Sequence, residues 1–111
     1  LHKTFVLLLQ VMKKSIKKKN KNFIEPSPEV FQSLIYSYSN GDLQGTLNKA
    51  KTLLKEYPDS PTLYNICGIT YSDLDKYEDA LDNFYLALQI NPNYADCHYK
   101  KGNTLQSLRQ L

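Results

Sequence analysis

The sequence predicts an all-α protein, an α-solenoid built from antiparallel helix hairpins that stack one on the next. Two observations predict it. A set of aromatic, small and proline residues within 61–94 recurs at a spacing of about 34 residues in the segments on either side. Helix start and stop signals divide the same region into short amphipathic segments. No window alternates convincingly between apolar and polar residues, so no β-strand is expected.

Five helices are expected, because N-cap residues and prolines recur along the chain. Ser27 and Ser60 each precede a proline, a pair that suits the N-cap and first turn of a helix. Asp42 can cap a helix of its own, while Asn-Gly and Asn-Pro pairs end helices. The expected helices run over 27–39, 42–57, 60–74 and 77–89, and from about residue 94 onward.

The segment 61–94 carries a full set of residues at fixed offsets: Tyr64, Gly68, Tyr71, Ala80, Phe84, Ala87 and Pro92. With this pattern the segment resembles one complete tetratricopeptide repeat, with Cys67 in place of the usual Leu. The resemblance implies a helix–turn–helix unit in which Gly68 admits a close helix neighbour and Phe84 fills the space beside it. A bulky residue at Gly68 is therefore expected to unfold the module, whereas Thr62→Ala is expected to be nearly neutral.

The flanking segments fit the same pattern less well. Residues 27–60 form a degenerate repeat, with Leu34 at the Gly offset. Residues 95–111 match a first helix, with Gly102 aligned with Gly68. His98 takes the aromatic offset, so we expect a packed core residue there. The resemblance implies that these helix pairs wind into a right-handed superhelix.

The repeats are expected to occupy 25–111, preceded by a basic leader over 1–24. The leader contains seven lysines and no acid, whereas the whole chain carries +3, so the repeats are net acidic. Blocks of like charge repel, and we expect the leader to be disordered. An alternative is contact with nucleic acid or an anionic membrane. The apolar run 5–12 is too short to span a bilayer, and translation starting at Met12 is a further possibility.

The sequence shows no reaction chemistry, so we expect no enzyme, catalytic residue, metal, cofactor or small-molecule substrate in this chain. It contains no phosphate-binding glycine loop, nucleophile elbow or zinc motif. The acids around one turn, such as Asp73 and Asp79, suit a helix start and a solvated surface. Cys67 and Cys97 lack metal spacing and are expected to be free thiols in a reducing compartment, which favours a cytoplasmic protein.

Proteins that this chain resembles hold a peptide or partner helix in a concave groove lined by the first helix of each repeat. Carried over by position, the resemblance implies that the groove is lined by Phe31, Ile35, Tyr38, Asn65, Ile69, Ser72, Asp96, Tyr99, Lys100 and Asn103. The family's carboxylate clamp is mostly absent, since Phe31 and Ile35 replace its first Lys and Asn, and Lys100 alone is compatible. The same positions would also suit an ordinary solvated or repeat-stacking face.

Two functions therefore remain open. The first is a protein–protein interaction module that scaffolds a protein or peptide partner. The alternative is the N-terminal scaffold or targeting region of a longer bacterial transferase or oxygenase, with its catalytic domain beyond residue 111.

Overall fold

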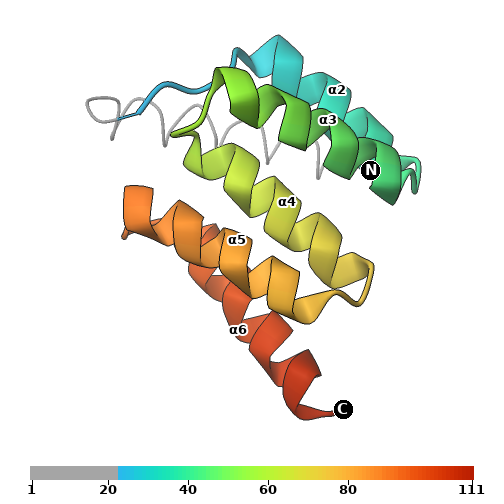
Figure 1. Ribbon diagram of the computed structural model, residues 1–111. Coiled ribbons are helices and arrows are strands. Elements are labelled where there is room, and N and C mark those ends of the chain that lie inside the picture. Colours follow the sequence, from blue (N-terminus) through green and yellow to red (C-terminus); the bar gives the residue numbers. More distant parts are fainter. Residues whose placement is uncertain (1–22) are drawn as a thin grey trace.

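The computed structural model describes residues 23–111, and all of its regular structure there is helical (Figure 1). The five helices are α2 (Pro28–Ser39), α3 (Leu43–Glu56), α4 (Pro61–Asp73), α5 (Tyr77–Ile90) and α6 (Ala95–Arg109). Their bounds lie within a few residues of those predicted from the sequence. No strand occurs in these residues, so the all-α prediction is confirmed for this part of the chain. The predicted disordered leader, 1–24, lies almost wholly outside the described residues.

The helices stack in chain order as an α-solenoid. Each helix packs against the next one, and α4 also contacts α6 (Figure 1). The first helices α2, α4 and α6 therefore belong to successive layers, with α3 and α5 as the second helices of the hairpins. This arrangement is typical of repeat proteins, in which each unit buries its apolar face only against its neighbours.

Capping explains where several of these helices begin and end. The Asp42 carboxylate accepts the Gly45 N–H at 3.0 Å, and the Ser60 hydroxyl accepts the Leu63 N–H at 3.1 Å. Ser27 occupies the predicted N-cap position of α2, and its side chain makes no capping hydrogen bond. Gly41 and Asp75, at equivalent positions after α2 and α4, both adopt positive φ, 82° and 61°. This left-handed turn is a common way to end a helix.

The close helix contact predicted at Gly68 is confirmed. A Cβ atom built there would lie 2.4 Å from a ring carbon of Phe84, so only glycine lets α5 approach α4 at this point. Phe84 is fully buried, so moving its ring aside would disturb its packed neighbours. At Gly102, by contrast, no heavy atom among the described residues lies within 4 Å of such a Cβ. The described part of the chain therefore provides no close contact at the second glycine.

The first repeat compensates for its departure from the pattern. Leu34 stands at the offset of Gly68, and Ala50 stands at the offset of Phe84. Both are almost completely buried in one core cluster with Leu47 and Leu63. Large and small residues have therefore exchanged places between the two helices of the hairpin. Because cores tolerate substitutions that conserve total volume, the repeat keeps its packing.

His98 is exposed, so the prediction of a packed core residue is wrong. Its Nε2 lies 2.8 Å from the carbonyl oxygen of Pro92. The equivalent residue in the preceding repeat, Tyr64, donates its hydroxyl to the carbonyl of Pro58 at 3.0 Å. In both repeats, the residue at the aromatic offset thus connects the start of the first helix to the preceding loop through a hydrogen bond.

Candidate functional site

The predicted groove residues come from α2, α4 and α6, and we call this set the groove face. The structure places them at very different depths. Phe31, Ile35 and Asn65 are buried, Tyr38, Ile69, Ser72, Asp96 and Lys100 are half-buried, and Tyr99 and Asn103 are exposed.

The two apolar residues of α2 pack inward. Phe31 and Ile35 belong to the same buried cluster as Leu34 and Leu63. Neither side chain presents an apolar surface in this structure. Their contribution here is to the core between α2 and the neighbouring helices.

Hydrogen bonds between side chains join the first helices of successive repeats. Tyr38 of α2 donates its hydroxyl to the carboxylate of Asp73 at the end of α4. Ser72 of α4 and Thr104 of α6 share a hydrogen bond of 3.0 Å between their hydroxyl oxygens. Burial, together with the neighbouring Asp73 carboxylate, raises the pKa of the Tyr38 phenol, so this group stays protonated and remains a donor.

Asn65 is the most constrained polar residue of the groove face. Its Nδ2 donates to the Asp96 carboxylate at 2.8 Å and lies 3.4 Å from the Tyr94 hydroxyl oxygen. Its side chain is only 2% exposed, and its Oδ1 has no hydrogen-bond partner among the described residues. Buried acceptors of this kind are rare, because an unpaired polar atom usually costs about 1–3 kcal/mol. Asn65 therefore has a free acceptor beside an acidic neighbour.

The exposed part of the groove face lies on α6. Tyr99 is 66% exposed, and the Lys100 ammonium lies 6.0 Å from the centroid of its ring. This distance is at the outer limit of a cation–π contact. Asn103 is exposed one turn further along the helix and can both donate and accept hydrogen bonds. Tyr99 and Asn103 are the most accessible members of the set.

A second polar group was not found by reasoning from the sequence. The carboxylate of Glu25 accepts hydrogen bonds from the Ser60 hydroxyl, from the Thr62 hydroxyl at 2.6 Å and from the Thr62 N–H at 3.3 Å. Burial raises the pKa of Glu25, although these hydrogen bonds act in the opposite direction. The partners lie 35 and 37 residues away in the chain, so no local motif signals the contact.

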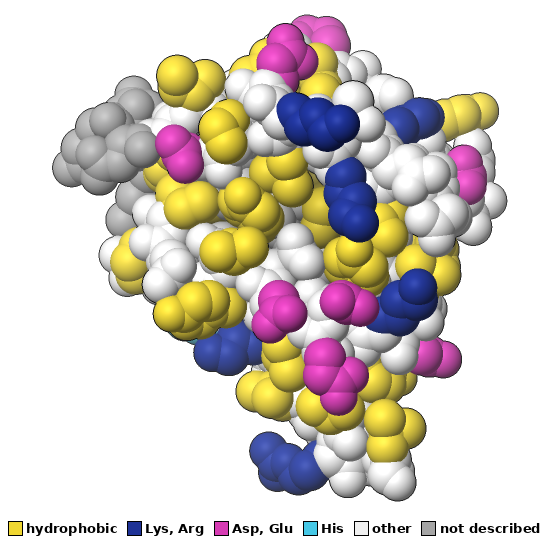
Figure 2. Space-filling view, viewed as in Figure 1, with side chains coloured by type: hydrophobic (Ala, Val, Ile, Leu, Met, Phe, Trp, Pro, Cys, Tyr) yellow, Lys and Arg dark blue, Asp and Glu magenta, His cyan; other side chains and the backbone are white. Residues whose placement is uncertain are grey.

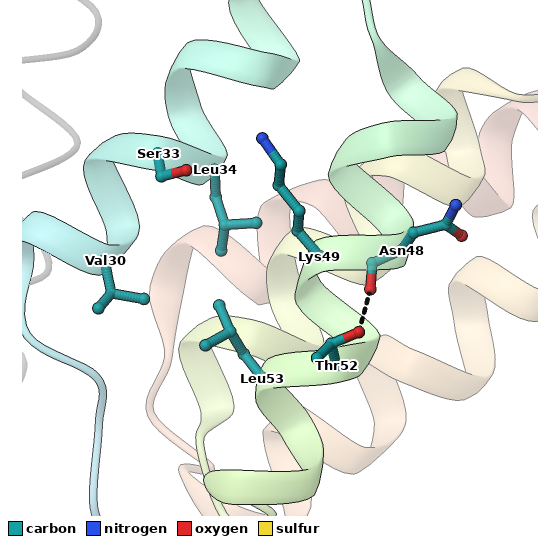
Figure 3. Close-up of a pocket in the computed structure, with 7 residues that line it drawn as sticks. All are labelled: Val30, Ser33, Leu34, Asn48, Lys49, Thr52 and Leu53. Atoms are coloured by element: carbon teal, nitrogen blue, oxygen red, sulfur yellow. Dashed lines mark hydrogen bonds between the residues drawn. The ribbon is translucent and has the colours of Figure 1, made fainter.

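A shallow cleft of about 540 Å³ lies between α2 and α3 (Figure 3). Its lining comes from Val30, Ser33, Leu34, Asn48, Lys49, Thr52 and Leu53. Val30 occupies the offset of Tyr64, and its smaller side chain leaves room at this end of the hairpin. The Lys49 ammonium donates to the Ser37 hydroxyl at 2.7 Å. The cleft brings together no nucleophile with a general base.

The described residues show no constellation suited to a metal. No group of three or more His, Cys, Asp or Glu side chains in 23–111 is arranged to hold a metal ion. Acidic side chains gather near the α4–α5 turn and along α5 (Figure 2), where Asp73, Asp75, Glu78, Asp79 and Asp82 are exposed. Their exposure is as expected for solvated charges at a helix start.

Both cysteines are free and buried. Burial raises the pKa of the Cys67 and Cys97 thiols to about 12, which keeps them in the weakly nucleophilic thiol form. Within the part of the chain that the structure describes, no helix is both long and apolar enough to cross a membrane.

Comparison with known proteins shows that this chain is similar to proteins named as receptors. The chain is 29% identical over 65 residues to a peroxisomal targeting signal receptor of Candida albicans, a match that covers 59% of this chain and 11% of the receptor. It is 23% identical over 78 residues to the peroxisomal targeting signal receptor of Candida glabrata, covering 70% of this chain and 13% of that protein. No family model matches the chain. The chain thus corresponds to only a small part of the length of these relatives.

Proposed function

We propose that this chain is a protein-interaction module of the tetratricopeptide-repeat type, whose groove face holds a peptide or partner helix. The observation that carries the proposal is the stacking of helix hairpins in chain order, together with the close contact between Gly68 and Phe84 that the repeat pattern predicts within 61–94. Similarity to two proteins named as receptors for a targeting signal supports a short protein segment as the class of partner.

The chemistry of the groove face favours recognition through hydrogen bonds. Tyr99 and Asn103 are exposed on α6 and Lys100 is half-buried between them, while the buried Asn65 holds Asp96 through a hydrogen bond. Amide side chains both donate and accept, so they suit the backbone of an extended or helical peptide. Tyr38, Ile69 and Ser72 flank this region, and Phe31 and Ile35 support it from the core.

The proposal includes no catalysis. The free thiols are buried and protonated, and the two relatives are receptors by name, so no observation favours the alternative of a transferase or oxygenase. We further propose that the repeats occupy 25–111, as units 27–60, 61–94 and 95–111, and that the protein is cytoplasmic. Binding of nucleic acid or an anionic membrane through the lysine-rich leader concerns residues outside the described part.

The proposal is tested by selecting ligands from a phage-displayed peptide library and measuring their affinity by fluorescence anisotropy. We expect dissociation constants in the micromolar range, since a small face provides about 8 kcal/mol of binding free energy. The double variant Tyr99→Ala, Asn103→Ala should weaken binding at least about tenfold, because it removes the two most accessible side chains.

A matched control removes the same residue types elsewhere. Tyr85 and Asn93 are also exposed, but they lie on α5 and in the following loop. The double variant Tyr85→Ala, Asn93→Ala should bind the selected peptides like the wild type. Equal losses in both double variants, or none in either, would rule out the groove face as the binding surface.

A further inference from the structure

One side of α6 is open to solvent, whereas the equivalent side of α4 is covered. On α4 this side, which we call the α4 stripe, consists of Tyr64, Cys67, Gly68 and Tyr71. Both tyrosines pack against the cluster that contains Phe84, and the Phe84 ring leaves no room for a Cβ at Gly68. The α4 stripe is therefore covered by α5, which runs antiparallel to α4 (Figure 1).

The residues at the same offsets on α6, extended by one further turn, form what we call the α6 stripe: His98, Lys101, Gly102, Leu105 and Arg109. At Gly102 no described heavy atom lies within 4 Å of an added Cβ, and Leu105 is 37% exposed. Lys101 is half-buried and Arg109 is exposed, so two cations flank this small apolar surface. Such a surface fits a helix that carries both an apolar side chain and a carboxylate, because a cation covered by a purely apolar helix would lose its hydration without a partner.

The outer side of α5 has the complementary composition. Its exposed residues three or four positions apart share one side of the helix, which we call the α5 stripe: Glu78, Asp82, Tyr85, Leu86 and Gln89. Tyr85 is 61% exposed and Leu86 is 40% exposed, so the α5 stripe offers apolar surface to a partner. The Gln89 amide donates to the Tyr85 hydroxyl at 2.8 Å, which holds the ring in place. The α5 stripe thus combines an aromatic side chain with two carboxylates.

The spacing of the α5 and α6 stripes also matches. Glu78 and Tyr85 are seven positions apart on α5, and Gly102 and Arg109 are seven positions apart on α6. Seven residues of an α-helix span about 10.5 Å along its axis. If two copies pack these helices antiparallel, as α4 and α5 pack, a Tyr85 ring on Gly102 places Glu78 opposite Arg109.

We propose that the α6 stripe binds the α5 stripe of a second copy of this chain, with the partner's Tyr85 on Gly102 and the partner's Glu78 beside Arg109. A contact between the α6 stripes of two copies is disfavoured, because it would bring like charges together. Each copy therefore uses two different surfaces, so the contact either closes into a ring or extends into a chain of copies.

The contact is expected to be weak and separate from the groove face. A single pair of helix stripes is a small interface, so we expect a dissociation constant of about 0.1–1 mM. The contact does not depend on the proposed function, because the α6 stripe lies on another side of α6 from Tyr99 and Asn103.

Sedimentation velocity of the full chain tests the proposal. The sedimentation coefficient should rise with protein concentration up to about 1 mM, and it should rise less at high salt, which screens exposed charges. Arg109→Glu and Glu78→Arg should each weaken self-association about fivefold or more, because an attractive pair of charges becomes a repulsive one. An equimolar mixture of the two variants should associate more strongly than either variant alone, since every contact between unlike copies again pairs opposite charges.

Two further variants separate the contact from the fold. Gly102→Leu fills the open space beside the glycine, so its melting midpoint should not fall, whereas self-association should fall at least about tenfold. Lys55→Glu is a matched control, because Lys55 and Arg109 both lie in the last turn of a helix, and it should associate like the wild type. The proposal is overturned if the wild type stays monomeric at the highest concentration, if Lys55→Glu weakens association as much as Arg109→Glu, or if mixing the two charge-reversed variants restores nothing.

Discussion

Two glycines at equivalent repeat positions should respond differently to the same substitution. Gly68 and Gly102 each lie inside a first helix, in α4 and α6. Replacing either by alanine improves helix propensity by about 1 kcal/mol. The surroundings differ, because a Cβ at Gly68 would lie 2.4 Å from the Phe84 ring, whereas one at Gly102 meets no described atom within 4 Å.

The magnitude follows from this difference. The propensity gain is the same at both positions, so it cancels when the two variants are compared. The remaining difference in stability is the cost of forcing a methyl group against the fully buried Phe84 ring, which is typically about 1–3 kcal/mol. Gly102→Ala should therefore stabilise the protein, and Gly68→Ala should lie below it by roughly that amount.

Thermal and urea unfolding followed by circular dichroism measure both changes. For a domain of this size, each 1 kcal/mol shifts the midpoint by about 4–8 °C, so the two variants should differ by several degrees. Equal stabilisation by both substitutions would show that α4 and α5 can separate at no cost, and the close contact between Gly68 and Phe84 would then have no energetic role.

Three further predictions use the same assay. Leu34→Gly and Ala50→Phe should each destabilise the protein. The double variant should lose less stability than the sum of the two single losses, with a coupling of about 0.5–3 kcal/mol, because it restores the arrangement of Gly68 and Phe84. Strictly additive losses would contradict the exchange of large and small residues between the two helices. Gly41→Ala should cost about 1–2 kcal/mol, because φ there is 82°, and an unchanged urea midpoint would mean that the turn adopts another conformation. The folded-state pKa of Glu25 is raised above 4.5, so its contribution to stability is greatest below that pH and is lost as the pH rises through the raised value. The stability of the wild type relative to Glu25→Gln should therefore fall as the pH rises above 4.5, and a rise would show that the hydrogen bonds outweigh burial.

The helices were predictable because their signals are local. Asp42 and Ser60 cap helices in the structure as their side chains suggested, and the contact between Gly68 and Phe84 lies within one repeat. The groove face was harder, because a position at the right offset can point into the core. Phe31 and Ile35 do so, since apolar side chains at these offsets gain more from burial against Leu34 and Leu63 than from facing solvent.

Long-range polar contacts escaped prediction altogether. The sequence suggested that Thr62→Ala would be nearly neutral, yet Thr62 is buried and donates two hydrogen bonds to Glu25. Losing a donor to a half-buried carboxylate generally costs about 1–3 kcal/mol, so we now expect a clear loss of stability. A single sequence cannot reveal a bond between residues 37 positions apart when neither belongs to a motif.

The polar bonds across the groove face also limit how a partner can bind. Asn65 already donates to Asp96, and Ser72 already shares a hydrogen bond with Thr104, so these bonds hold α4 and α6 at a fixed distance. A ligand that took over the Nδ2 of Asn65 would leave a carboxylate of Asp96 without its donor. The Oδ1 of Asn65 has no hydrogen-bond partner among the described residues, but it is buried, so a ligand N–H could reach it only if α4 and α6 moved apart. The favoured partner is therefore one that binds through the exposed Tyr99 and Asn103 and leaves the bonds of Asn65 intact, and peptides selected against the protein should lose more affinity in the double variant Tyr99→Ala, Asn103→Ala than in Asn65→Ala.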